Sequence, residues 1–132
     1  MRRDFKLPAD DEAFLDSRGH GWETVRENGT RWLLLENYQL PVGYNVTQAS
    51  IALRIQEMYP DVQIDMAYFL PHLARTDGQP INALTPLAID GKQWQQWSRH
   101  RTGADAWQIG VDNVERHLLF TQAFLETELR KR

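Results

Sequence analysis

The run WQQWSRHR, residues 94–101, contains the side chains of this sequence that are best suited to catalysis or recognition. Two indoles three residues apart lead into arginine, histidine and arginine, and a further indole, Trp107, follows. Residues spaced three apart share one face of a helix, and large indoles are usually buried there with their N–H groups satisfied. We therefore interpret residues 91–103 as partly helical, with at least one of Trp94 and Trp97 closing a core.

The two arginines of the run indicate a functional alternative. Guanidinium groups are seldom buried without partners, and an arginine stacked on an indole is preorganised to hold a carboxylate. We therefore predict a surface that binds an acidic group or a peptide C-terminus. Its members are expected to be Trp94, Trp97, Arg99, His100, Arg101 and Trp107.

Catalytic and metal-binding patterns are weak in this chain. Ser98 precedes His100 by two residues, which suggests a nucleophile with its base. Neighbours in sequence rarely have the geometry of such a pair, however, and the chain has no Gly-x-Ser-x-Gly turn. Asp65, His72 and Asp77 lie near one another in sequence but lack the spacing of a zinc site. We predict neither a metal site nor a cofactor.

The composition excludes several classes of protein. The chain has 132 residues and no cysteine, so it has no disulfide, thiolate metal site or thiol nucleophile. Its length predicts one domain over residues 1–132. A net charge of −3 argues against nucleic-acid binding, and no apolar run is long enough for a membrane helix. Without a secretory signal at the N-terminus, we expect a cytoplasmic protein.

Patterning predicts an α+β fold. Proline and carboxylates within 7–12 suit the start of a short helix, which the glycines after Arg18 end. Alternation of apolar and polar residues, separated by turn signals, then predicts a four-stranded antiparallel meander. Its strands are expected at 22–26, 31–38, 49–55 and 63–70.

The second half of the chain is less regular. Residues 71–90 contain three prolines and no clear periodicity, which predicts an irregular segment. A final helix follows, with a capping box formed by Asp112 and Glu115, and an apolar stripe that ends near Leu129. The basic residues 130–132 suit the C-terminal dipole of that helix. We expect both helices to pack against one face of the sheet.

Several sequence segments resemble the ubiquitin-conjugating-enzyme (UBC) superfamily, and most closely its prokaryotic family E. The segments are LPADDEAFLD, LENYQLPVGYN, MYPDVQIDMAYFLP, DGKQWQQWSRHR and GVDNVERHL. The resemblance runs from about Leu7 to Leu129, and Tyr59-Pro60 and Trp97 match residues that these enzymes carry. It implies a UBC-like fold with an N-terminal helix, a four-stranded meander, an irregular active-site-like segment and a C-terminal helix.

The chain departs from this family at the expected active site. Active members carry His-Pro-Asn after the fourth strand, followed by a glycine and the nucleophilic cysteine. Here His72 could stand near the histidine position, but no Pro-Asn follows it, and Asn82 occupies the neighbourhood of the thiol. An amide is neither a nucleophile nor a leaving group comparable to a thiolate. The usual thioester mechanism is therefore absent from this polypeptide.

The resemblance and the missing cysteine together suggest a binding module of a bacterial ubiquitin-like system that acts without a covalent intermediate, as a pseudoenzyme. The partners it implies are a ubiquitin-like modifier, an adenylating activating enzyme and a metal-dependent deconjugating peptidase. The alternative is an acyl-transfer enzyme that uses Ser98 or Lys92 as nucleophile, or a site assisted by His72 or His100. A third possibility is a scaffold subunit whose aromatic surface completes an oligomer.

Overall fold

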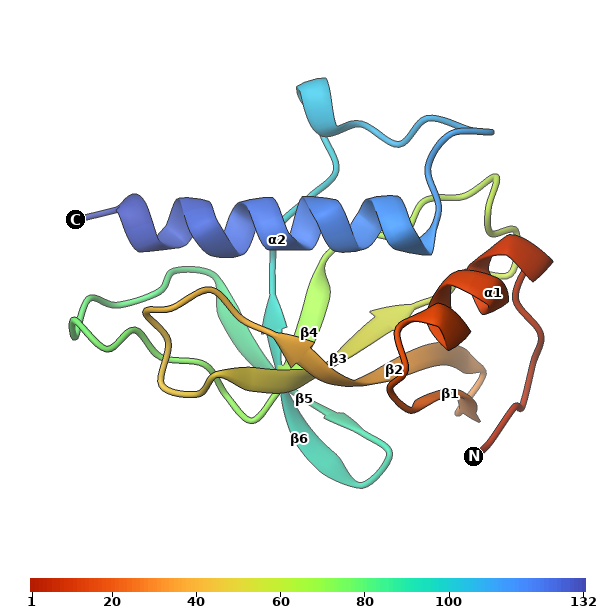
Figure 1. Ribbon diagram of the computed structural model, residues 1–132, viewed down its shortest axis with the longest axis horizontal. Coiled ribbons are helices and arrows are strands. Elements are labelled where there is room, and N and C mark those ends of the chain that lie inside the picture. The colour runs from red at the N-terminus through yellow and green to blue at the C-terminus, as the bar shows by residue number, and fades with distance from the viewer.

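The structure, a computed structural model, describes residues 1–132 as an α+β fold in which two helices accompany a six-stranded antiparallel sheet. Figure 1 shows the elements in chain order from red to blue. They are α1 (Ala9–Ser17), β1 (Trp22–Glu27), β2 (Thr30–Gln39), β3 (Gln48–Arg54), β4 (Ala67–Leu70), β5 (Leu84–Ile89), β6 (Lys92–Trp97), the 3-10 turn η1 (Gly103–Asp105) and α2 (Val114–Arg130).

The sheet has the strand order β1-β2-β3-β4-β6-β5. Strands β1 to β4 are neighbours in the sheet in the order of the sequence, so the predicted antiparallel meander of these four strands is confirmed. The prediction of only four strands is wrong, because β6 pairs with β4 and β5 forms the edge beyond it. The fourth strand is also shorter than expected, since 63–66 do not join the sheet.

Residues 84–97 form a hairpin that the sequence patterns did not predict. Asp90 and Gly91 make its two-residue turn with φ values of 52° and 76°, the left-handed backbone that a tight hairpin turn requires. The interpretation of 71–90 as wholly irregular is therefore wrong, as is the partly helical interpretation of 91–103. Pro86 is tolerated in β5 because this is an edge strand.

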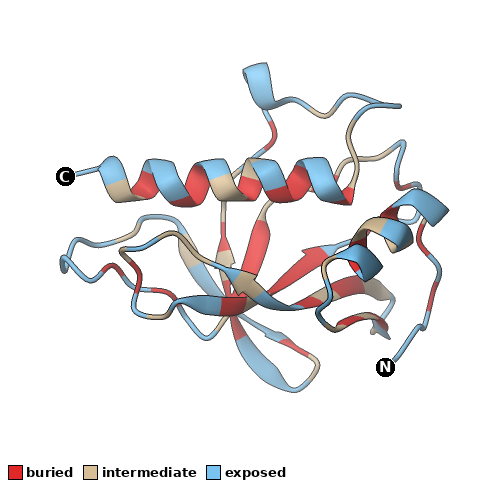
Figure 2. Ribbon diagram, in the orientation of Figure 1, coloured by how far each residue is buried: buried red, intermediate tan, exposed pale blue.

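Helix α2 lies across one face of the sheet, and its buried residues lie on the side of the helix that faces the strands (Figures 1 and 2). The largest hydrophobic cluster, which we call the larger core, fills the space between the helices and the sheet. Asn113 caps the helix, since its side chain accepts a hydrogen bond from the Arg116 N–H at 2.9 Å. The predicted Asp112 capping box is wrong, because Asp112 instead contacts Arg101 and the Gln108 N–H.

The β5–β6 hairpin folds back over the other face of the sheet. Its turn residue Asp90 donates its N–H to the Glu27 carboxylate at 2.6 Å, and Arg2 bridges Asp90 and Glu23. Because β1 and β5 stand at opposite ends of the strand order, these contacts require a strongly curled sheet. A smaller core lies inside the curl. Its buried members are Trp32, Ala52, Tyr68, Ile89 and Trp94.

A buried carboxylate joins the two helices. Asp11 of α1 accepts hydrogen bonds from the Tyr59 hydroxyl at 2.6 Å and from the Val114 N–H at 3.2 Å. Burial raises the pKa of Asp11, whereas these two donors oppose the rise. Tyr59 of the family's Tyr-Pro pair therefore anchors α1 to the start of α2.

No helix in the structure combines the length and the apolar character that crossing a membrane demands.

Candidate functional site

The tryptophans of WQQWSRHR lie on opposite faces of β6, because side chains alternate along a strand. Trp97 is fully buried in the larger core, where it stacks on Phe124 with ring centroids 5.7 Å apart. Trp94 belongs to the smaller core, and its indole N–H donates to the Ile89 carbonyl at 3.1 Å. The prediction that at least one of them closes a core is confirmed, since both are core residues, but the helical face expected to carry them is wrong because 92–97 form a strand.

Arg101 is buried, and its side chain binds other residues of the loop that connects β6 to α2. Its guanidinium group donates to the Asp105 carbonyl at 2.6 Å and pairs with the Asp112 carboxylate at 3.0 Å. A third contact, of 3.1 Å, reaches Nδ1 of His117. These bonds hold the loop against α2. Because the side chain is only 5% exposed, little of the guanidinium group remains for a ligand.

Arg101 also fixes the ring of His117. Arginine can only donate, so Nδ1 of His117 accepts, and Nε2 therefore donates to the Met66 carbonyl at 2.7 Å. Burial lowers the pKa of His117 to about 4, and the neighbouring guanidinium group acts in the same direction. Burial alone would raise the pKa of Asp112, but its bonds from Gln108 N–H and Arg101 outweigh that effect and lower it.

The remaining predicted binding residues do not form one surface with Arg101. Arg99 lies over the Trp97 ring at 4.9 Å and pairs with Glu128 of α2 at 3.0 Å. Trp107 is half-buried beneath Arg101 and donates its indole N–H to the Pro60 carbonyl. Only His100 is largely exposed. The structure thus spreads the predicted set over both sheet faces and the β6–α2 loop.

The weak catalytic candidates are also separated. Nδ1 of exposed His100 contacts the Asp65 carboxylate at 2.8 Å, which orients the ring and leaves Nε2 toward solvent. His72 is exposed, and its Nε2 contacts the Gln93 carbonyl at 3.2 Å. Ser98 is half-buried and accepts a hydrogen bond from Gln96 at 3.3 Å. Neither histidine is hydrogen-bonded to Ser98.

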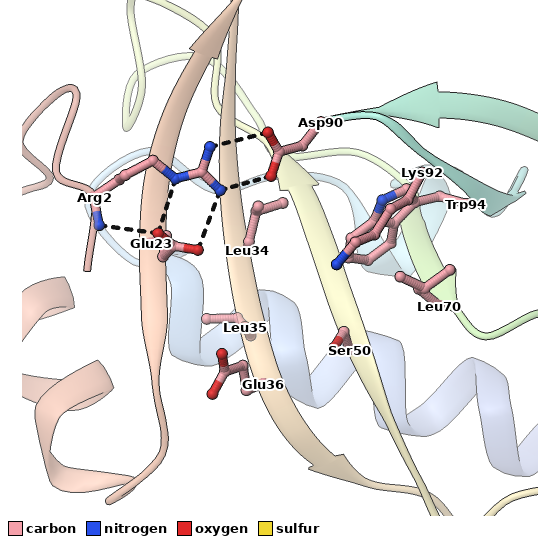
Figure 3. A pocket seen from close by; sticks show the side chains of 10 residues that line it. All are labelled: Arg2, Glu23, Leu34, Leu35, Glu36, Ser50, Leu70, Asp90, Lys92 and Trp94. Atoms are coloured by element: carbon pink, nitrogen blue, oxygen red, sulfur yellow. Dashed lines mark hydrogen bonds and ion pairs between the residues drawn. The ribbon is translucent and has the colours of Figure 1, made fainter.

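Lys92 lies apart from Ser98 and from both histidines. It lines a cavity of about 130 Å³ on the sheet face opposite α2, together with Leu70, Trp94 and the Arg2 bridge (Figure 3). No carboxylate lies within ion-pair distance of its ammonium group, whereas Arg2 in the same cavity is paired with Glu23 and Asp90. Lys92 is therefore accessible, but it has no neighbouring histidine that could act as its base.

A polar cavity of about 380 Å³ lies where the segment after β4 passes beneath the last turn of α2. We call it the C-terminal pocket. In Figure 1 this segment is the green loop that extends to the left, below the C-terminal end of α2. Pro80 is the only apolar residue that lines the pocket. Its residues are Arg75, Gln79, Pro80, Asn82, Glu128, Lys131 and Arg132.

A buried ion-pair network forms the floor of the C-terminal pocket. Arg75 donates to the Glu128 main-chain carbonyl at 2.7 Å and pairs with the exposed Asp77. The Glu128 carboxylate, 3% exposed, receives Arg99 at 3.0 Å and Lys131 at 3.4 Å. Hydrogen bonds from Gln79 N–H and from Arg75 lower the pKa of Asp77. The network fixes the loop of 75–82 on the helix end.

The rim of the C-terminal pocket carries donors that the chain does not fully use. The Lys131 side chain is 57% exposed, and Arg132 makes no ion pair. The amide side chains of Gln79 and Asn82 make no hydrogen bond within the chain, and both are exposed. Cations and amides of this kind suit a carboxylate or a peptide C-terminus. No group of three or more His, Cys, Asp or Glu side chains is arranged to hold a metal ion.

Most residues of this pocket were not predicted from the sequence. Asn82 was identified from the resemblance, but the basic residues 130–132 were assigned only to the helix dipole. The signal that could have indicated the site was the irregular segment of 71–83, since long irregular chain in a compact protein is often functional. Its partner at the end of α2 is distant in sequence, and no periodicity connects the two.

Comparison with known proteins assigns the chain to a family. Residues 7–128 match the Prokaryotic E2 family E, which covers nearly the whole chain. Neither curated proteins nor solved structures give a match. Family membership implies partners from a ubiquitin-like modifier system in general. The missing cysteine is then a departure within a conjugating-enzyme-like family, and the C-terminal pocket includes Asn82. The chain belongs to the Prokaryotic E2 family E, a UBC-like family, and it lacks cysteine.

Proposed function

We propose that this protein binds a ubiquitin-like modifier non-covalently and that the C-terminal pocket holds the C-terminal carboxylate of the modifier. One observation carries the proposal: a family member without any thiol has a polar, cationic pocket that includes Asn82, and the resemblance implies that the family's nucleophile would lie in this part of the chain. A carboxylate that cannot form a thioester here can still be held by charge-assisted hydrogen bonds. The resemblance also implies an activating enzyme and a deconjugating peptidase as further partners.

The arrangement of charges supports this ligand. Asp77 and Glu128 are the two carboxylates near the pocket, and both are already paired with arginine. Lys131 and Arg132 are exposed at the rim and can approach an incoming anion. Because Pro80 is the only apolar residue in the pocket lining, the pocket suits a polar chain end better than a hydrophobic side chain.

Calorimetry with the candidate modifier tests the proposal. We expect a Lys131→Gln/Arg132→Gln variant to bind at least about tenfold more weakly, because each charge-assisted hydrogen bond contributes about 1.5–3 kcal/mol at most sites. A Lys6→Gln variant is the matched control, since Lys6 is an exposed lysine outside the pocket. If the modifier does not associate with the native protein, the proposed function is wrong.

A second candidate function is acyl transfer without cysteine. The observation that favours it is the Asp65–His100 pair, because a histidine oriented by a carboxylate can act as a base on an incoming amine. Incubation with activating enzyme, ATP and modifier would then give a covalent adduct that Ser98→Ala or Lys92→Ala abolishes. We expect no adduct, and a stable or hydroxylamine-labile one would favour acyl transfer over binding alone.

A further inference from the structure

The two edges of the sheet differ in whether their main-chain groups are paired. Residues 2–5 cover the edge of β1, since Asp4 N–H donates to the Thr24 carbonyl at 2.8 Å and Thr24 N–H donates to the Arg2 carbonyl at 3.1 Å. No segment pairs with the outer side of β5. Residues 85–88 of that strand are exposed. An unpaired edge of this kind is a template for an added strand.

The register of the hairpin determines which groups face outward. Ile89 and Lys92 flank the two-residue turn as a hydrogen-bonded pair, so the alternate positions 84, 86 and 88 direct their main-chain groups away from β6. No hydrogen bond outside the β5–β6 ladder uses a main-chain group of these three residues. Pro86 has no N–H to offer, so the free edge presents the N–H groups of Leu84 and Ala88 and three carbonyls.

Pro86 also argues against a second copy of the chain as the occupant. Two β5 strands related by a two-fold axis at Pro86 would place proline opposite proline, and both N–H donors of that pair would be missing. A different partner strand that donates an N–H to the Pro86 carbonyl, and needs no donor in return, loses no hydrogen bond. The edge therefore favours a different chain over self-pairing, and proline at an edge is a common protection against aggregation.

A cavity of about 420 Å³ lies beside this edge, and we call it the edge cavity. Leu87 and Ala88 of β5 line one side, and the β1–β2 turn lines another. Trp32 and Tyr68 also line it, as an edge-to-face pair 5.0 Å apart. Arg54 is exposed at its border, and no carboxylate lies within ion-pair distance of it. An extended peptide on β5 would direct alternate side chains into this cavity.

The C-terminal pocket lies at the start of the same strand. Asn82, which lines the pocket, precedes Leu84 by two residues, whereas the edge cavity is lined by residues near the end of β5. A strand whose carboxylate occupies the pocket must therefore run from Ala88 toward Leu84, antiparallel to β5. At about 3.4 Å per residue, four steps along the edge span about 14 Å. A tail of about six residues covers this edge and reaches the pocket.

We propose that the C-terminal tail of the modifier adds to the free edge of β5 as an antiparallel strand and places its carboxylate in the C-terminal pocket. This inference rests on the proposed function and deepens it, because it assigns the conformation, direction and side-chain contacts of the ligand. Main-chain hydrogen bonds at Leu84 and Ala88 hold the strand, and the edge cavity accepts an apolar side chain. Arg54 accommodates an acidic residue in the preceding part of the tail.

The test uses intact, semisynthetic modifier whose last six residues carry N-methyl groups at alternate positions. N-methylation removes a donor without changing charge, and only every second N–H of an added strand faces β5. Calorimetry should show that one alternate set weakens binding at least about tenfold while the other set leaves the affinity unchanged. Equal effects of the two sets, or no effect of either, would overturn the strand geometry.

Variants of the protein give an independent test. Ala88→Pro removes an edge donor whose nitrogen faces away from β6, so the hairpin ladder stays intact, and binding should weaken at least about fivefold. Unchanged tryptophan fluorescence and near-UV circular dichroism establish that the variant is folded. A C-terminally amidated modifier should bind native protein and Lys131→Gln/Arg132→Gln equally weakly.

The outcomes distinguish the two proposals. If the native protein does not bind the unmodified modifier, the proposed function fails, and the strand geometry with it. If the modifier binds but Ala88→Pro and both N-methylated forms bind as tightly as the native pair, only the strand geometry fails. If amidation of the modifier weakens binding but Ala88→Pro does not, the carboxylate is bound in the C-terminal pocket and the tail does not pair with β5.

Discussion

Cations gather at both ends of α2, and the two groups differ in how completely the chain satisfies them. Near the start of the helix, Arg101 is surrounded by the Asp105 carbonyl, Asp112 and His117. Near its end, Arg75 and Arg99 are similarly paired with Glu128, but Lys131, which also reaches Glu128, and Arg132 are exposed at the rim of the C-terminal pocket. The first group is closed, and the second has an open rim.

This difference separates a structural role from a binding role. A buried arginine that binds carbonyl, carboxylate and imidazole acceptors of its own chain fixes loop against helix, and its removal takes a hydrogen bond from each of these groups. An exposed cation with one distant partner contributes little to stability and can exchange that partner for a ligand. The run WQQWSRHR therefore positions the β6–α2 loop, whereas the helix end is the better candidate for recognition.

Removal of Arg101 should have the largest effect on stability. We expect Arg101→Met to lower the free energy of unfolding by about 3–5 kcal/mol, because it leaves the Asp112 carboxylate and Nδ1 of His117 unpaired in a buried site. Urea unfolding followed by tryptophan fluorescence measures the change. Arg116→Met is the matched control, since Arg116 is exposed on α2 and makes no ion pair. A loss of less than about 1 kcal/mol would contradict the structural role.

The closed group should also respond to pH through His117. Its pKa is lowered from 6.5 to about 4 by burial, so folding favours the neutral ring. Above pH 6.5 this contribution to stability is fully present, and it is lost progressively as the pH falls from 6.5 toward 4. The loss by pH 4 amounts to about 3 kcal/mol.

Urea unfolding at pH 7, 6, 5 and 4 measures the effect of His117. A His117→Gln variant is the control, because it lacks the titrating ring while the neighbouring Asp65, Asp112 and Arg101 remain. The difference in pH dependence between native protein and variant isolates the contribution of the imidazole. Parallel curves for the two proteins would show that the ring titrates at the same pH in the folded and unfolded states, which would contradict its burial beside Arg101.

Much of the fold follows from local patterns. The helix α1 and the first three strands were predicted within a few residues, because alternation, Asn28-Gly29 and the glycines after Arg18 act over short distances. The β5–β6 hairpin was missed although Asp90-Gly91 is a strong turn signal. Pro86 and the exposed side chains of β5 hid the strand, since an edge strand with no buried face has no periodicity to detect.

The tryptophan pair shows why the candidate site was only partly predictable. A spacing of three residues places side chains on one face of a helix or on opposite faces of a strand. Both faces of β6 are buried, by α2 on one side and by the curled sheet on the other, so Trp94 and Trp97 are both core residues. Nothing local to the run indicates that two cores exist. The same holds for Lys131, whose neighbours in the pocket come from the loop after β4.

The open rim should have the smallest effect on stability of all. We expect Lys131→Gln/Arg132→Gln to change the free energy of unfolding by less than about 0.5 kcal/mol, because exposed ion pairs and charges near a helix end contribute little. Lys131 is 57% exposed, and its only ion-pair partner, Glu128, keeps Arg99 at 3.0 Å. Urea unfolding measures this change beside Arg130→Gln, a cation of the same helix end that does not line the pocket.

The decisive comparison is between that stability and the affinity for the modifier. If the double variant unfolds like the native protein and binds the modifier at least about tenfold more weakly, the rim acts on the ligand and not on the fold. If it unfolds more easily by more than about 1 kcal/mol, Lys131 and Arg132 belong to the same closed network as Arg75. The distinction between the two ends of α2 would then disappear, because both groups of cations would serve the chain itself.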